Sequence, residues 1–290
     1  MRSMPSMLHG EAVPSPASGG GEHGRLVSVA ASALAAATLG AAQALAAWPI
    51  LIGRVAFFLL ILVVLGALWD KVAAERVTPL AGMLPPGGLA VYLGVTEWVT
   101  LSLVAVERHV EDDIRHGGLE PYLLRPKSYL LQRMAPAMGG TIVRLAALGA
   151  AGCAALALSG RALPAPGAWP ALLLLGCLGC VLGMLLYMMV GLAAFWMRRT
   201  QPAMLIVQKL DFLLGGLVAP ISLYPDWLFE LAKATPFGAH LYWVGVQALT
   251  PSRGLFLAGV GWQMLWIAAL TALCALLWRT GLRKALREGL

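Results

Sequence analysis

Charged residues are scarce in this sequence. Asp, Glu, Lys and Arg make up 12% of its 290 residues and hydrophobic residues make up 59%, whereas soluble domains average about 25% charged and about 45–50% apolar residues. This composition excludes a soluble globular domain. A membrane-spanning helix needs about 20 apolar residues, so half a dozen such helices leave room only for short loops and for no second sizeable domain.

Cysteines are few and nucleotide-binding motifs are missing. The four cysteines lie in apolar stretches, and the C-x-x-C pair of Cys177 and Cys180 has no second pair or nearby histidine to complete a metal site. No G-x-x-x-x-G-K-[S/T] motif occurs, which excludes a P-loop in this chain. We therefore expect no metal, no redox chemistry and no cofactor here. The lack of an internal repeat argues against a secondary transporter built from inverted repeats.

The sequence does have six apolar runs that are long enough to cross a bilayer. These runs are residues 51–69, 89–106, 137–158, 171–197, 204–223 and 255–278. They predict an all-α polytopic membrane protein. If the first run enters from the cytoplasm, thirteen Lys and Arg residues lie on the cytoplasmic side and five on the outer side, which predicts cytoplasmic termini by the positive-inside rule. The net charge of +7 then reflects topology, and we expect no binding to nucleic acid.

Two segments precede these runs. Residues 1–24 are rich in Pro, Gly and Ser, which is typical of a disordered tail. Residues 25–48 are rich in alanine, and as a helix they place Arg25, Ser32 and Gln43 on one stripe. This amphipathic pattern favours a helix that lies in the membrane interface, with a seventh span or a cleaved signal peptide as the alternatives. A seventh span would move the N-terminus to the outer side, so the topology favours the interfacial helix.

The longest predicted cytoplasmic loop, residues 107–133, holds the densest cluster of charge in the chain. Its composition predicts a helix over 107–116 that stops at Gly117, and a second short helix over 120–124 that ends before Pro126. Four apolar side chains are expected to be exposed in it: Leu119, Tyr122, Leu123 and Leu124. Their exposure favours docking against a partner. The alternative is a solvated loop that only orients the protein.

The same loop resembles a known family. Its stretch E-D-D-I-R-H-G-G-L from Glu111, followed by L-L-R-P from Leu123, resembles the D-I-R-x-G … L-L-R-P signature of type-2 ABC exporter (ABC-2) permeases, and within them the viologen-exporter-like branch. The segments T-E-W from Thr96, Y-P-D-W from Tyr224 and T-P-F from Thr235 are similar to that family as well.

The resemblance implies one permease domain over residues 25–290, with an interfacial elbow helix, six spans and both termini in the cytoplasm. It also implies that the loop couples the permease to a separate ATP-binding subunit, which binds ATP and Mg²⁺, and that the permease pairs with a second copy or a paralogue in the cytoplasmic (inner) membrane. The residues expected to contact the ATPase are Glu111, Asp113, Arg115, Gly117, Leu124, Arg125 and Pro126.

Two acidic residues lie within apolar runs, where a charge is costly and is by default a functional hypothesis. Glu97 is near the middle of the second run and Asp211 lies in the fifth. They could meet a cationic substrate such as a lipophilic cation or drug, or they could pair with Arg144 or Lys209, because buried charges are normally paired.

Residues 223–254 are predicted to form two short helices that dip toward the membrane at its outer face. The resemblance places an extracellular gate here; the alternative is an interfacial aromatic loop. The candidate gate residues are Pro220, Pro225, Trp227, Pro236 and Phe237. In the fourth run, the spacing of Gly179 and Gly183 permits close helix packing, within one chain or at a dimer contact.

The sequence therefore predicts the membrane subunit of an ATP-driven exporter. An ion-coupled secondary transporter is one alternative. An integral-membrane enzyme is another, and it would need a catalytic set near one surface. His240 with Asp226 and Glu230 is the only external set of histidine and carboxylates, and their spacing matches no catalytic motif.

Overall fold

The computed structural model describes residues 20–74, 88–125, 127–160, 163–217 and 219–288, and the regular secondary structure in these ranges is entirely helical. The α-helices are α1 (Gly20–Ala46), α2 (Trp48–Ala74), α3 (Gly88–Ser102), α4 (Val106–Arg115), α5 (Glu120–Leu123), α6 (Tyr129–Leu158), α7 (Trp169–Leu192), α8 (Gln201–Leu214), α9 (Asp226–Ala234), α10 (Pro236–Leu249) and α11 (Arg253–Glu288). Three short 3₁₀ helices are η2 (Pro166–Ala168), η3 (Ala193–Phe195) and η4 (Ile221–Leu223). The all-α membrane fold is thus confirmed.

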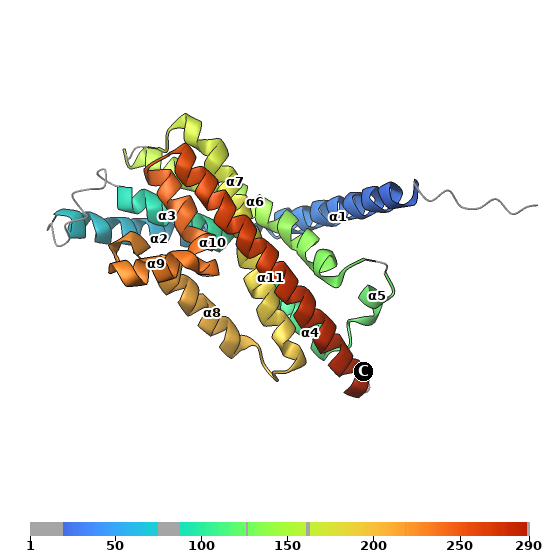
Figure 1. The fold of residues 1–290 in the computed structure, drawn as a ribbon. Coiled ribbons are helices and arrows are strands. Elements are labelled where there is room, and N and C mark those ends of the chain that lie inside the picture. Colours follow the sequence, from blue (N-terminus) through green and yellow to red (C-terminus); the bar gives the residue numbers. More distant parts are fainter. Residues whose placement is uncertain (1–19, 75–87, 126, 161–162, 218, 289–290) are drawn as a thin grey trace, which may run out of the picture.

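The core of the bundle forms around α7 and α10. Helix α7 packs against α3, α4, α10 and α11, and α10 also packs against α3 (Figure 1). Helices α2 and α6 cover another face of α3. The side chains at the centre, including Leu175, Leu182 and Leu241, are almost completely buried. Burial of apolar residues among neighbouring helices therefore organises the fold.

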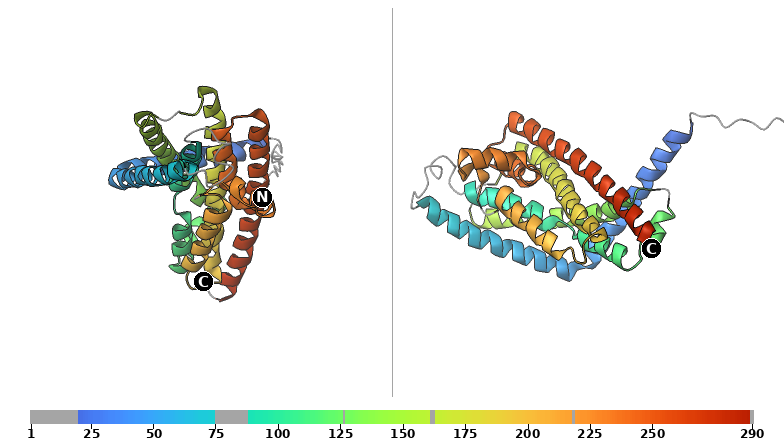
Figure 2. Two further views of the ribbon diagram at one scale, coloured as in Figure 1. Left: turned by 90° about the vertical axis from the view of Figure 1, so that its left-hand side faces the viewer. Right: turned by 60° about the horizontal axis from the view of Figure 1, so that its bottom comes forward.

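The helices alternate in direction, so their ends collect at two ends of the molecule. Helices α4 and α5, the end of α7, the start of α8 and the C-terminus of α11 gather at one end, called the α5 end (Figures 1 and 2). The end of α2, the start of α3 and helix α9 lie at the other, called the α9 end. This grouping agrees with the prediction that successive loops lie alternately on the two sides of the membrane.

Helix α1 projects away from the bundle and meets it along α6 (Figure 1). The two helices cross closely, because a Cβ atom on Gly40 would collide with the backbone of Pro136 and one on Gly139 with the backbone of Ala37. The helix begins at Gly20, five residues before the predicted start, so the predicted tail is too long there. The rest of that tail, residues 1–19, lies outside the described residues.

Six helical stretches in the described ranges are long and apolar enough to cross a membrane. They are Val27–Ala46, Trp48–Trp69, Gly88–Arg115, Tyr129–Leu158, Pro166–Phe195 and Arg253–Arg287. Five of these correspond to predicted runs. The first belongs to α1, which satisfies the length and composition of a span and is hardly buried by the rest of the protein. Its interfacial position stays a prediction.

The predicted span over 204–223 is wrong as a single helix. Helix α8 ends at Leu214, and its 14 residues extend about 21 Å, less than the bilayer core of about 30 Å. The chain stops being helical at Gly215 and Gly216, where Gly216 has a φ of 76°, a conformation that glycine adopts easily. The connection after α8, with η4, takes the chain on to α9.

The second span, Gly88–Arg115, contains a short break, because α3 ends at Ser102 and α4 begins at Val106. A helix end leaves carbonyl oxygens without helical donors. Two arginines from other helices bind carbonyls in this region: Arg54 Nη1 donates to Leu101 O at 2.9 Å and Arg144 Nη1 donates to Leu103 O at 2.6 Å. Both side chains thus point to the break.

Candidate functional site

Helix α4 is the first part of the predicted coupling loop, and it has one buried and one exposed face. Val110 and Ile114 on the buried face are at most 6% exposed and pack in the main core with side chains of α7. Gly191 of α7 permits this approach, since a Cβ atom there would lie 2.8 Å from Val110 Cβ. The amphipathic sequence therefore places α4 flat against the bundle.

Asp113 ties α4 to the first turns of α6. Its carboxylate is 7% exposed and accepts a hydrogen bond from Tyr129 Oη at 2.6 Å. Arg133 donates to the same carboxylate through Nε, at 2.6 Å, and through Nη2. Such a bidentate, charge-assisted pair fixes orientation as well as distance. Asp113 is therefore directed into the protein.

Glu111 and Arg115 tie α4 to the connection between α7 and α8. The Glu111 carboxylate accepts hydrogen bonds from the backbone N of Thr200, at 3.3 Å, and from its hydroxyl. Arg115 Nε lies 2.8 Å from Glu111 Oε1, and its Nη2 donates to Met197 O at 2.9 Å. The sequence analysis did not predict a role for Thr200, because none of the motifs in the chain includes it.

An aromatic cluster joins the same region to α11. The rings of Tyr129 and Trp278 are stacked at 4.1 Å, Tyr122 meets Tyr129 edge-on at 5.5 Å, and Phe195 meets Trp278 at 5.9 Å. Arg133 lies 4.6 Å above the Tyr122 ring. We call α4, α5, the first turns of α6, residues 196–200 and the Trp278 region of α11 the coupling block.

The exposed tip of the coupling block lies between α4 and α6. Helix α4 ends at Arg115 with His116 as its C-cap, and Gly117 follows with a φ of 71°, which supports the predicted glycine stop. Leu124 is 86% exposed, and Arg125 is exposed as well. Leu119 was predicted to be exposed but is buried. Pro126 lies outside the described residues.

The predicted ATPase contacts thus fall into two groups. Gly117, Leu124 and Arg125 lie on the exposed tip, whereas Glu111, Asp113 and Arg115 bind partners within this chain. The first group is available to another protein. The second group makes the contacts that join α4 to α6 and to the connection between α7 and α8.

The two predicted substrate residues lie in the bundle core. Glu97 is 7% exposed and Asp211 is 4% exposed, and the two carboxylates interact electrostatically. The predicted pairs with Arg144 or Lys209 are not formed in the part of the chain that the structure describes: Arg144 binds the Leu103 carbonyl and Lys209 lies 5.7 Å from the centroid of the Phe212 ring. Glu97 has no hydrogen bond or ion pair there.

Asp211 has a partner that the sequence analysis placed elsewhere. Its Oδ1 lies 2.9 Å from Nδ1 of His240, and the histidine is fully buried. His240 is therefore not part of an external set with Asp226 and Glu230, and that prediction is wrong. Glu230 instead lies 3.5 Å from Lys233 on α9.

Glycines on α7 make space for this histidine. A Cβ atom on Gly179 would lie 2.8 Å from His240 O, and one on Gly183 would lie 2.8 Å from His240 Nε2. The glycine pair therefore serves packing within the chain, one of the two predicted uses. His240 Nε2 has no hydrogen-bond partner among the described residues.

The two short helices predicted in residues 223–254 are present as α9 and α10. Thr235 caps α10, because its Oγ1 accepts from Gly238 N at 3.2 Å. Of the predicted gate residues, Pro220 is buried, Pro225 and Trp227 are exposed, and Pro236 and Phe237 are half-buried. Helix α10 is far more deeply buried than a surface aromatic loop would be. The role of these five predicted residues as a gate stays a prediction.

A family model described as ABC-2 family transporter protein matches residues 90–288, which is more than half of the chain. The chain belongs to the ABC-2 transporter family. It is accordingly a multi-pass membrane protein and a permease component of an ABC exporter. ABC-2 permeases usually work with an ATP-binding subunit and are not themselves enzymes. No curated protein matches the chain.

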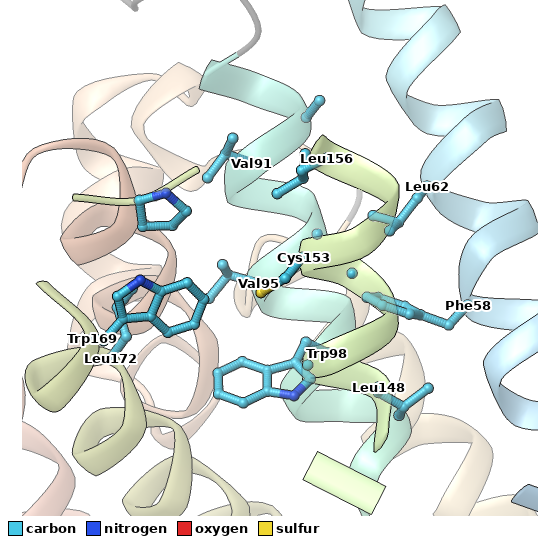
Figure 3. A pocket seen from close by; sticks show the side chains of 15 residues that line it. Phe58, Leu62, Val91, Val95, Trp98, Leu148, Cys153, Leu156, Trp169 and Leu172 are labelled. Carbon is cyan, nitrogen blue, oxygen red and sulfur yellow. The ribbon is translucent and has the colours of Figure 1, made fainter. Parts of the chain in front are cut away.

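This ABC-2 permease also has an apolar cavity between α2, α3, α6 and α7 (Figure 3). The cavity has a volume of about 50 Å³. Trp98 and Trp169 line one part of it, and Phe58 and Leu62 of α2 lie opposite (Figure 3). The Trp98 indole is fixed by a 2.7 Å hydrogen bond from Nε1 to Leu145 O. This cavity offers apolar contact on the same helix that carries Glu97.

Proposed function

We propose that this permease couples ATP hydrolysis on a separate ATP-binding subunit to the outward movement of a lipophilic cation or drug, as a member of the viologen-exporter-like branch. In this proposal it works in the cytoplasmic membrane with both termini cytoplasmic and pairs with a second copy or a paralogue. The observation that carries the proposal is the coupling block, whose exposed tip is rigidly tied to several membrane helices.

The contacts of the coupling block support transmission in three directions. Asp113 holds Arg133 of α6, Glu111 and Arg115 hold the α7–α8 connection, and the aromatic cluster reaches α11. A displacement of the tip would therefore move the ends of α6, α7, α8 and α11 together, as in a rigid-body transition. A solvated loop that only orients the protein would not need these contacts.

The buried carboxylates support a cationic substrate. Glu97 has no ion-pair partner among the described residues, and it lies in the electrostatic range of Asp211. The ionised form of such an acid is costly in a low-dielectric bundle, and a bound cation would stabilise it.

The first test is affinity purification of the tagged permease from mild detergent, with identification and ATPase assay of the proteins that come with it. We expect a P-loop ATPase to be recovered with the wild type and with the control Arg253→Ala, since Arg253 is an exposed arginine at the start of α11, far along the helix from Trp278. Arg125→Ala is expected to lose most of it. Recovery of a transport-competent permease without any ATPase would overturn the proposal in favour of ion-coupled transport.

The substrate class is tested by ATP-driven uptake of a lipophilic cation into inverted vesicles that contain the complex. Glu97→Gln is expected to lower uptake at least tenfold while leaving basal ATPase activity intact, because the change removes only the buried charge. Glu230→Gln, a change of an exposed glutamate on α9, is the control. Equal uptake by both variants would contradict the assignment of Glu97 to the substrate pathway.

A further inference from the structure

A second, polar groove lies between α1, α6 and the break between α3 and α4, and its volume is about 420 Å³. This volume is within the range of small-molecule sites. Its polar side chains are Gln43, His109, Arg133 and Arg144, and among the described residues no Asp or Glu lines it. The walls contributed by α1 are otherwise glycine and alanine. The groove is thus basic, and it is open enough to hold a molecular group.

The arginines around this groove differ in how their charge is balanced. Arg133 is neutralised by Asp113. Arg144 is half-buried and donates to a backbone carbonyl, and in the described part of the chain it has no carboxylate within 4.0 Å. Arg54, which lies nearby, also donates to a backbone carbonyl and has no carboxylate within 4.0 Å among the described residues. Its positive charge repels that of Arg144. Buried charges are normally paired, so the positive charges of Arg54 and Arg144 favour an anion.

We propose that the groove binds the phosphate-containing headgroup of an anionic phospholipid. Basic pockets between membrane helices on the cytoplasmic side are suited to anionic headgroups. A lipid fits better than free phosphate because the apolar side chains of Leu39, Leu45 and Trp48, at the end of α1 and the start of α2, are all at least 59% exposed. These side chains offer a surface along which acyl chains can continue from the headgroup.

The position of the groove connects the lipid to the coupling block. His109 belongs to α4, and Arg133 and Arg144 belong to α6. Arg144 and Arg133 are eleven residues apart, about 16 Å along the helix, so the basic lining of the groove extends over about three turns of α6. A bound headgroup would therefore hold α1 and α6 against the break at which α4 begins.

The experiment uses the full chain in mild detergent and measures lipid retention by native mass spectrometry. Phosphatidylglycerol and phosphatidylcholine with the same acyl chains are added in equal amounts. We expect wild-type protein to retain about fivefold more phosphatidylglycerol, as one added basic contact implies. Arg144→Gln, which keeps a donor for the Leu103 carbonyl, is expected to remove most of this preference. Arg144→Lys is expected to keep it.

Arg279→Gln is the matched control, because it removes an exposed arginine of α11 that lies outside the groove. If it reduces phosphatidylglycerol retention as much as Arg144→Gln does, the lipid is held by surface charge in general and the proposal fails. Equal retention of both lipids by the wild type also overturns it. Displacement of the lipid by millimolar inorganic phosphate would assign the groove to free phosphate instead. If Arg144→Gln does not fold, the wild-type and Arg144→Lys comparisons still decide.

Discussion

Asp113 is the buried carboxylate that joins α4 to α6. It binds the Tyr129 hydroxyl and the Arg133 guanidinium in a nearly closed environment. Removal of one partner of a buried ion pair leaves the other charge unpaired. The sequence placed Asp113 among the ATPase contacts, but its chemistry in the fold is that of an anchor.

Asp113→Ala is therefore expected to destabilise the protein by about 3 kcal/mol, the lower end for a broken buried pair. Thermal unfolding of the purified permease in detergent measures this as a lower Tm. Asp112→Ala is the neighbouring control, because the Asp112 side chain is 70% exposed and its loss is expected to leave Tm almost unchanged. Equal effects of the two variants would show that the Asp113 contacts are not structural anchors.

Gly117 allows a second prediction at the residue scale. It has a φ of 71° and no atom lies within 4 Å of a Cβ placed on it. Gly117→Val therefore acts through backbone strain alone, which costs about 1–2 kcal/mol for a residue forced into this conformation. Gly117→Asn is expected to be milder, since asparagine tolerates it.

Gly160 provides the control for this change. It has a φ of 66° and equally open surroundings, but it follows α6 at the end of the helix opposite to the coupling block. Both valine variants are expected to lower Tm by a similar amount, and only Gly117→Val is expected to lower ATPase activity of the complex. Loss of activity in both would mean that strain at any turn impairs the permease.

At the scale of the elements, the contact between α7 and α10 depends on a glycine. Gly179→Ala brings a Cβ atom to 2.8 Å from the backbone oxygen of His240, which the fixed backbone of α10 cannot easily avoid. We expect a loss of about 1–3 kcal/mol, as for overpacked cores. Gly261→Ala in α11, where nothing lies within 4 Å, is expected to be neutral or slightly stabilising. Thermal unfolding of both variants tests this.

The elements that the sequence predicted well are those with a strong local signal. The apolar runs of α2, α3, α6, α7 and α11 and the glycine stop after α4 were visible in composition and spacing. The stop of α8 at Gly215 and Gly216 lies inside a predicted apolar run. Glycine alone does not mark such a stop, because glycine is tolerated inside membrane helices.

The elements that the sequence could not place depend on tertiary contacts. Residues 223–254 have an interfacial pattern of prolines and aromatic residues, yet α10 is buried because α3, α7 and α11 surround it. The pair between Asp211 and His240 joins positions 29 residues apart, and no local pattern predicts it. The same holds for Glu111 and Thr200, which are 89 residues apart.

For the whole molecule, the grouping of helix ends predicts which surfaces face the same side of the membrane. Leu124 at the α5 end is 86% exposed and Trp227 at the α9 end is 71% exposed. We expect single changes Leu124→Cys and Trp227→Cys to be labelled by a membrane-impermeant maleimide from opposite sides of the vesicle. The wild type is the control, because its four cysteines lie within the helices. Labelling of both from one side would contradict the proposed topology.

Helix α7 has a glycine notch, a position where the missing side chain lets another helix approach closely, at each of two contacts. Gly183 receives His240, and Gly191, eight residues later, receives the backbone of α4 at Glu107. The notches are about 12 Å apart along a single uninterrupted helix. A tilt of α7 by about 5° therefore shifts one notch sideways by about 1 Å relative to the other. A displacement of that size would change the packing at both contacts, so α10 at His240 and α4 at Glu107 cannot be repacked independently of each other.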